Sequence, residues 1–148
     1  MIDDKDREII ESLRSNGRLS YRELGEAVRL SANAVAERVR RLQESGVIKG
    51  FEATVDLRAL DLPLQAIIDV KMSPGVTAQT FEAALHIIPG IVEACLTTGS
   101  FDYMLRVACR DQDALVLLTE NLRARGGVQE TYTRVVLRPV RLRNRLLA

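Results

Sequence analysis

The sequence predicts an α+β protein with an N-terminal winged helix-turn-helix domain and a C-terminal ferredoxin-like βαββαβ domain. Two observations support this fold class. Through residues 1–50, apolar side chains recur at helical spacing and serine caps mark where helices begin. From residue 64 onward, strand-like and helix-like segments follow in the order β-α-β-β-α-β. A chain of 148 residues has room for two small domains of this kind.

The first two predicted helices are bounded by clear start and stop signals. We expect one helix over residues 3–15, ended by Asn16 and Gly17. A second helix begins at Ser20, where Glu23 lies three residues further on. This spacing is a capping box, because the serine hydroxyl accepts from a free backbone N–H while the glutamate bonds back to the cap.

A third helix is predicted close behind the second. It begins at Ser31, a good N-cap, and runs to about Ser45, followed by Gly46. Only Arg29 and Leu30 lie between the second helix and this cap. A turn this short forces a sharp crossing of the two helices, which is the helix-turn-helix arrangement.

The predicted third helix has a buried stripe and an outward face suited to DNA. Val35, Val39 and Leu42 form the stripe at helical spacing. Asparagine, arginine and glutamate on the outward face are residue types that contact base edges and phosphates. Since ordinary surface helices carry such residues too, the prediction also depends on the caps, the short turn and the seven arginines against three glutamates in residues 14–41. We therefore expect contacts with double-stranded DNA from Arg22, Ser31, Asn33, Ala34, Glu37, Arg38, Arg40 and Arg41.

The predicted domain boundaries place the helix-turn-helix domain in residues 1–50, a β segment and linker in 51–63, the ferredoxin-like domain in 64–141 and a basic tail in 142–148. Residues 47–56 have the composition of a β segment. In the C-terminal domain we expect strands over 65–72, 91–98, 103–109 and 129–137, and helices over 77–87 and 111–125. Both helices can cover only one face of the sheet.

The other face of the predicted sheet is mixed in character. Asp69, Lys71 and Arg106 make it polar, while Ile67 and Ala108 interrupt the polar surface. A half-apolar face that no helix covers favours a subunit interface.

Composition argues against a classical enzyme and against a membrane protein. One histidine and two separated cysteines offer no zinc-ligand spacing, and no phosphate-binding glycine motif is present. We expect neither a cofactor nor a metal. No apolar run approaches 18 residues and the start of the chain is acidic, so we expect a cytoplasmic protein with reduced cysteines.

The chain resembles the leucine-responsive regulatory protein/AsnC family of transcription regulators over nearly its whole length. Each matching motif is short, but their order and spacing are specific. The motifs are Asp6-Arg7-Glu8-Ile9-Ile10, Gly17-Arg18-Leu19-Ser20, Leu30-Ser31, Arg38-Val39-Arg40-Arg41-Leu42, Gly46-Val47-Ile48-Lys49-Gly50-Phe51, Gly99 with Asp102-Tyr103 and Leu105, Gly127-Val128, Thr131 with Thr133, and Val135-Val136-Leu137.

The resemblance implies a homo-oligomer that responds to a small molecule. Protomers would pair into dimers and assemble further into tetramers or octamers, with the segment at 50–56 joining two protomers. An amino acid or related effector would bind between C-terminal domains. The residues that the resemblance assigns to this site are Leu96, Gly99, Ser100, Asp102, Arg134, Val135 and Val136.

The sequence departs from the family pattern at two positions. Arg29 replaces a glycine in the turn before the third helix, which requires a less common backbone conformation and adds a possible phosphate contact. Ser100 replaces an acidic residue in the effector loop, which puts the usual effector in question.

Two questions remain open at this stage, namely the role of Asp102 and the function of the whole chain. Asp102 either holds the ammonium group of an effector or accepts backbone N–H bonds within its turn. The chain is either a ligand-responsive DNA-binding regulator or an amino-acid-binding enzyme subunit or metabolic sensor whose N-terminal helices dock protein. A third possible function of the chain is that of an architectural DNA-binding protein without an effector.

Overall fold

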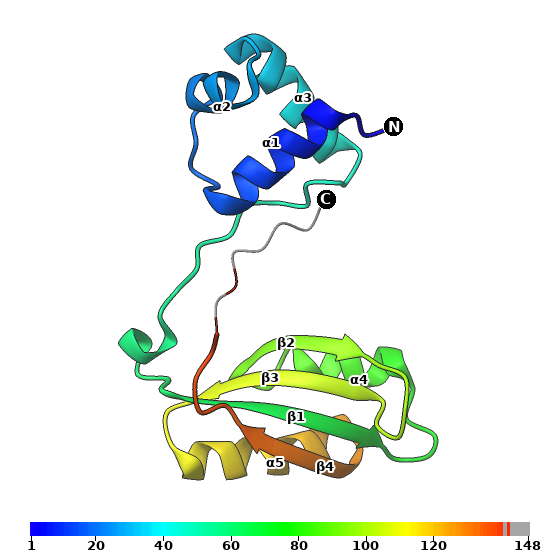
Figure 1. Cartoon of the computed structure of the whole chain (residues 1–148). Coiled ribbons are helices and arrows are strands. Elements are labelled where there is room, and N and C mark those ends of the chain that lie inside the picture. The colour runs from blue at the N-terminus through cyan, green and yellow to red at the C-terminus, as the bar shows by residue number, and fades with distance from the viewer. Residues whose placement is uncertain (141, 143–148) are drawn as a thin grey trace. The chain divides into compact units, whose positions relative to one another are not determined.

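The computed structural model describes residues 1–140 and 142. The chain forms two compact units, one built from residues 1–54 and the other comprising residues 55–139, as Figure 1 shows. Of the predicted tail at 142–148 only Leu142 is described, and Arg141, the last residue of the predicted C-terminal domain, also lies outside the described residues.

The N-terminal unit contains three helices, α1 (Asp4–Ser15), α2 (Tyr21–Val28) and α3 (Ala32–Glu44). Each begins at a capping residue whose side chain accepts a bond from the backbone N–H three residues later, and these caps are Asp3, Ser20 and Ser31. The predicted caps at Ser20 and Ser31 are therefore confirmed. In α2, Glu23 completes the predicted capping box by accepting from the Ser20 N–H at 2.8 Å.

The three helices enclose a small apolar core. The predicted stripe of α3 is confirmed, since Val35, Val39 and Leu42 are all buried. They pack with Ile9 of α1 and with Leu24 and Val28 of α2. Burying each such side chain contributes about 1.5–3 kcal/mol, so this cluster fixes the mutual packing of the helices.

The turn between α2 and α3 is as tight as its sequence predicts. Arg29 adopts the left-handed conformation, with φ of 58°, as expected for a residue at a position where the family has glycine. The Leu30 N–H donates to the Gly25 carbonyl at 2.9 Å and closes the turn. A Cβ on Gly25 would lie only 2.6 Å from the Leu30 carbonyl oxygen, so the close approach requires glycine.

The single chain forms no strand at 47–56, so the β segment predicted there stays a prediction. No strand spans these residues, and a one-turn 3₁₀ helix, η1 (Leu57–Leu60), follows them. A strand requires a ladder of hydrogen bonds with a neighbour, and no part of the described chain pairs with this segment. The composition of residues 47–56 therefore favours extended backbone, but the described chain provides no strand to pair with it.

The C-terminal unit is an antiparallel four-stranded sheet with two helices. The elements are β1 (Leu64–Met72), α4 (Ala78–Leu85), β2 (Ile91–Leu96), β3 (Tyr103–Cys109), α5 (Gln112–Gly126) and β4 (Val128–Val135). The strand order is β2-β3-β1-β4. All six predicted elements are present with ends within two residues of those expected, and the βαββαβ order is confirmed.

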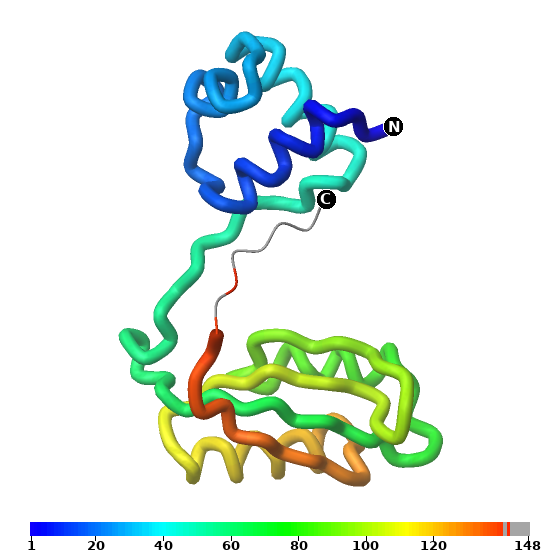
Figure 2. The backbone as a smooth tube through the Cα atoms, in the orientation of Figure 1, coloured from blue at the N-terminus to red at the C-terminus, as the bar shows by residue number. Residues whose placement is uncertain are grey.

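Both helices of this unit lie on one face of the sheet, as Figures 1 and 2 show. Side chains alternate along β1, so that Ala66, Ile68 and Val70 are buried against the helices. Phe81 of α4 and Leu122 of α5 complete this core. Within the unit, no helix covers the opposite face.

Candidate DNA-binding and effector sites

The N-terminal half of α3 presents polar groups on an exposed surface. The Ser31 hydroxyl accepts from the Ala34 N–H at 3.2 Å and so caps the helix. Asn33 and Glu37 are exposed further along the same helix. A helix N-terminus carrying an asparagine near its cap can approach a phosphate and a base edge together.

Two predicted DNA contacts form salt bridges within their own helices. Arg40 donates to Glu37 and to Glu44, both at 2.5 Å, and all three side chains are more than half exposed. These carboxylates raise the pKa of Arg40, and Arg40 in turn lowers the pKa of Glu37. On α2, Arg22 lies 3.2 Å from Glu26 with 86% of its side chain exposed. Since such surface pairs are worth little, both arginines remain free to exchange partners.

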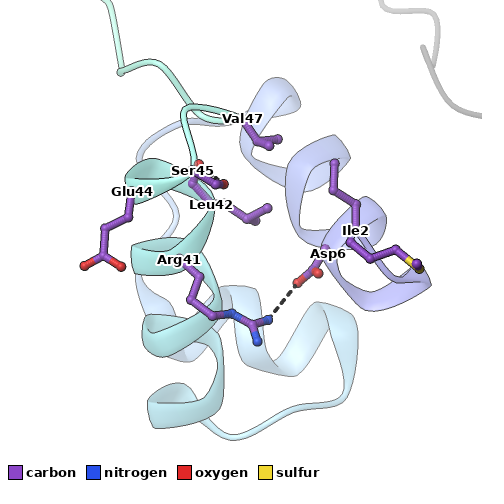
Figure 3. Close-up of a pocket in the computed structure, with 8 residues that line it drawn as sticks. Ile2, Asp6, Arg41, Leu42, Glu44, Ser45 and Val47 are labelled. Carbon is purple, nitrogen blue, oxygen red and sulfur yellow. Dashed lines mark hydrogen bonds and ion pairs between the residues drawn. The ribbon is translucent and has the colours of Figure 1, made fainter.

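Arg38 differs from the other arginines of α3. Its Nη1 atom donates to Asp3 at 2.7 Å and to Asp6 at 2.8 Å, and only 24% of its side chain is exposed. The two carboxylates raise the pKa of the Arg38 guanidinium. Arg41 is 56% exposed, and its Nη2 atom lies 3.7 Å from Asp6. Figure 3 marks this ion pair with a dashed line. The helical wheel predicted both as outward-facing contacts, but Arg38 is directed towards α1.

The predicted effector loop is anchored through Asp102. Its carboxylate accepts from the Met72 N–H at 2.8 Å, its own N–H donates to the Val70 carbonyl at 2.8 Å, and its carbonyl accepts from Thr97. This is the backbone-binding turn aspartate that the sequence left as one of two alternatives. The tip of the loop is open, because Ser100 is exposed and a Cβ at Gly99 would contact nothing within 4 Å.

The remaining predicted effector residues lie along or beside the edge strands. On the sheet face that the helices leave uncovered, Arg134 donates to Asp69 at 2.6 Å and lies 5.7 Å from the centre of the Tyr132 ring. Val135 and Leu96 are both more than half exposed. The Val136 N–H donates to the Gln65 carbonyl at 2.8 Å. The sequence analysis did not single out Tyr132, which lies beside Arg134 because the two residues alternate along β4 and share one face.

One chain does not bring the predicted effector residues together. Asp102 bonds to the end of β1 at Val70 and Met72, whereas Arg134 and Val135 pair with Ile67 and Ala66. Three to six strand residues separate these backbone positions, which corresponds to about 10–20 Å. The two groups nevertheless adjoin through their aromatic rings, since the ring of Phe101 in the loop lies 6.4 Å from that of Tyr132 and Arg134 lies 5.7 Å from the centre of the same Tyr132 ring.

Two cavities in the described part of the chain lie in the N-terminal unit. One of about 490 Å³ lies between the start of α1 and the end of α3, lined by Ile2, Asp6, Arg41 and Leu42 among others (Figure 3). The other, of about 370 Å³, is bordered by Leu13, Tyr21 and Phe51. Neither includes a predicted effector residue.

None of the helices in residues 1–140 is long and apolar enough to cross a bilayer. Within the same range, no cluster of three or more histidine, cysteine, aspartate or glutamate side chains could hold a metal ion.

A helix-turn-helix unit followed by a βαββαβ unit defines a two-domain DNA-binding regulator. Comparison with protein-family models agrees with both parts. Residues 2–49 match the winged helix-turn-helix DNA-binding domain, and residues 65–146 match the Lrp/AsnC ligand-binding domain. The chain belongs to the Lrp/AsnC family, and it is a DNA-binding transcription regulator rather than an enzyme.

Individual relatives match over almost their whole length. The leucine-responsive regulatory protein of Escherichia coli K12 is 36% identical over 149 aligned residues, covering 99% of this chain and 91% of the relative. A transcriptional regulator of Mycobacterium tuberculosis is 36% identical over 92% of each chain.

Solved structures show the same fold. A transcriptional regulator of Neisseria meningitidis in complex with L-methionine has a TM-score of 0.89 at 28% identity, covering 99% of this chain and 96% of that one. A feast or famine regulatory protein of M. tuberculosis complexed with L-methionine has a TM-score of 0.90 at 27% identity, covering 96% of each chain.

Proposed function

We propose that α3 enters the major groove of operator DNA and that its exposed N-terminal half reads sequence. The observation that carries this proposal is the exposed face of α3 behind a well-capped N-terminus. In a dimer, two such helices would meet half-sites about one helical turn, or a multiple of it, apart. The proposed contacts are Arg22, Ser31, Asn33, Ala34, Glu37, Arg40 and Arg41. Because the target is chromosomal DNA, we also propose a cytoplasmic location.

The DNA contacts are tested by selecting a duplex from a random-sequence pool and measuring binding by fluorescence anisotropy. Asn33→Ala should cost about 1–3 kcal/mol and relax preference at one base position. Arg41→Ala should weaken binding to all sequences and lower the salt slope by about 0.9. Arg123→Ala, an exposed arginine on α5, is the matched control. Equal loss in the control and the α3 variants would contradict the proposal.

We propose that the protein works as a homo-oligomer, a dimer that assembles into a tetramer or octamer. Two features of the chain support this. The sheet face away from α4 and α5 carries the partly buried Ile67 and Met104, and the extended residues 51–56 lack a pairing strand. A second copy of the same segment would supply that strand. Light scattering should give a mass above one protomer, and Ile67→Asp should reduce it. A monomeric mass at micromolar concentration would refute the proposal.

We propose an amino acid as the effector, bound between C-terminal domains of different copies. Two similar structures are complexes with L-methionine. The tip of the loop at Gly99 and Ser100 is open, and Arg134 lies on the sheet face that no helix covers, so a second copy packed on this face would complete the site.

A thermal-stability screen with the twenty amino acids tests this effector. A ligand that binds the folded state must raise its apparent stability. One amino acid should raise the melting temperature and change the mass or the DNA affinity. If none does, the effector proposal is wrong and an architectural regulator without an effector is favoured.

A further inference from the structure

The first turn of α1 is bonded to both helices of the helix-turn-helix. Asp3 and Asp6 divide their oxygens between two tasks. One oxygen of each closes the capping box of α1, at 2.8 Å to the Asp6 N–H and 3.2 Å to the Asp3 N–H. The other oxygen of each accepts from the same Nη1 atom of Arg38 on α3. The cap of α1 and its link to α3 are thus one hydrogen-bonded unit.

A neighbouring lysine connects the same turn to α2. Lys5 Nζ donates to the Val28 carbonyl at 2.8 Å, at the last residue of α2 and directly before the left-handed Arg29. This bond satisfies a carbonyl that the end of the helix would leave free. Lys5 also pairs with Glu8 at 2.8 Å. Three charged residues in one turn therefore hold the end of α2 and the middle of α3.

The burial of this unit distinguishes it from the ion pairs that Arg40 makes within α3. Asp6 is the one buried charged residue among those described, with 2% of its surface exposed. A buried carboxylate needs its partner, because water does not replace the lost bond. Arg40, by contrast, pairs only within α3 and remains exposed. An arginine held by a buried acid is poorly placed to leave it for a phosphate.

We infer that Arg38 is a positioning residue, which sets the angle of α3 against α1 through Asp3 and Asp6 and makes no contact with DNA. This inference rests on the DNA-binding function and assigns one residue of that surface a different role. A recognition helix held in its binding orientation before DNA arrives loses less freedom on association, which strengthens binding.

The sign of an Asp6→Asn effect separates positioning from direct contact. If Arg38 contacted DNA and Asp6 merely competed for it, removing the acid would release the arginine and strengthen binding. If Arg38 positions α3, the same change weakens binding although it removes a negative charge close to the DNA-binding surface. Electrostatics alone therefore predicts the opposite result.

The experiment compares four single variants and one double variant of the full-length protein on the selected duplex across a salt series. Arg38→Met and Asp6→Asn should each weaken binding about 10-fold or more, with the salt slope of the wild-type protein. Arg123→Met on α5 is the matched control, since this exposed arginine lies outside the proposed DNA contacts, and it should bind as the wild-type protein does. Arg41→Met should lower the slope by about 0.9, as loss of one phosphate contact does. In a double-mutant cycle, Arg38→Met with Asp6→Asn should cost no more than either change alone.

Two results would overturn the inference. One is tighter binding by Asp6→Asn, and the other is a salt slope reduced by about one in Arg38→Met. Circular dichroism checks that each variant folds. If Asp6→Asn does not fold, Asp3→Asn decides, because asparagine caps a helix as well as aspartate while losing the charge that faces Arg38. Weaker binding then supports positioning, and unchanged or tighter binding refutes it. Failure of the wild-type protein to bind any duplex would instead refute DNA binding itself.

Discussion

Replacing Arg29 with glycine should stabilise the N-terminal unit, because Arg29 holds a left-handed conformation that side chains disfavour. Its φ of 58° and ψ of 50° place it at the C-cap of α2. The left-handed region costs an L-residue with a Cβ about 1–2 kcal/mol. Glycine adds about 0.4–1 kcal/mol of chain entropy to the unfolded state. The difference leaves a net gain of about 0.5–1 kcal/mol for Arg29→Gly.

The control for this prediction is an arginine-to-glycine substitution at Arg22, in the first turn of the same helix. Arg22 lies within α2 in a helical conformation, and its side chain is 86% exposed. Arg22→Gly should cost about 1 kcal/mol, since glycine is a poor helix former. One chemical change on one short helix should therefore have opposite signs in its first turn and at its C-cap.

Hydrogen exchange of the buried amides of α3 in the full-length protein measures the effect. Val35 and Val39 belong to the core of this unit, so exchange at their amides reports its opening free energy. Protection should rise about 2- to 5-fold in Arg29→Gly, which is what the expected gain corresponds to. Equal or lower protection would show that the left-handed turn costs nothing here, and the reasoning from backbone strain would fail.

Three further outcomes are expected from the packing. Gly25→Ala should destabilise the N-terminal unit by about 1–3 kcal/mol in urea unfolding, because its Cβ would lie 2.6 Å from a backbone oxygen. Burial and a 2.7 Å bond to Glu82 raise the pKa of Tyr103 from 10 to about 12, so the stability from this hydroxyl is complete below pH 10 and is lost as pH rises through 12. Phenolate absorbance of Tyr103→Phe against wild type checks this, and a phenol titrating near 10 would contradict it. Asp102→Ala should lower the melting temperature without any effector, at a cost of about 1–3 kcal/mol, since it leaves a backbone N–H unpaired. An unchanged temperature would show that the turn does not need this bond.

Local signals in the sequence were sufficient for most of the fold. Ser20, Ser31 and Gly46 mark helix ends through bonds that lie within a few residues, so the chemistry of the cap can be read directly. Alternation along residues 65–72 likewise fixed which side of β1 is buried. The segment at 47–56 shows the limit, because strand formation depends on a partner that its own residues do not specify.

The candidate site was harder to predict for the same physical reason. A helical wheel places Arg38 by angle alone, and its true partners lie 32 and 35 residues away on α1. Nothing in the residues around Arg38 indicates that two carboxylates already closing a helix cap also face it. For Asp102, the turn composition allowed two roles, and only the backbone bond to Met72 shows the one that the free chain uses. The sequence pattern does not show which residues distant in the chain contact one another in the folded protein.

The loop between β2 and β3 has a base that is hydrogen-bonded to β1 and an open tip at Gly99 and Ser100. This arrangement affects how easily the loop can change in evolution. Asp102 holds the base of the loop to β1 through hydrogen bonds to backbone groups of Val70 and Met72, and these bonds do not depend on neighbouring side chains. At the tip, Gly99 has open space around it and Ser100 faces outward. Substitutions at Ser100 can accumulate at little cost to folding. This loop is therefore a place where new ligand preferences can be explored, by natural drift or by a saturation library, on a scaffold that stays unchanged.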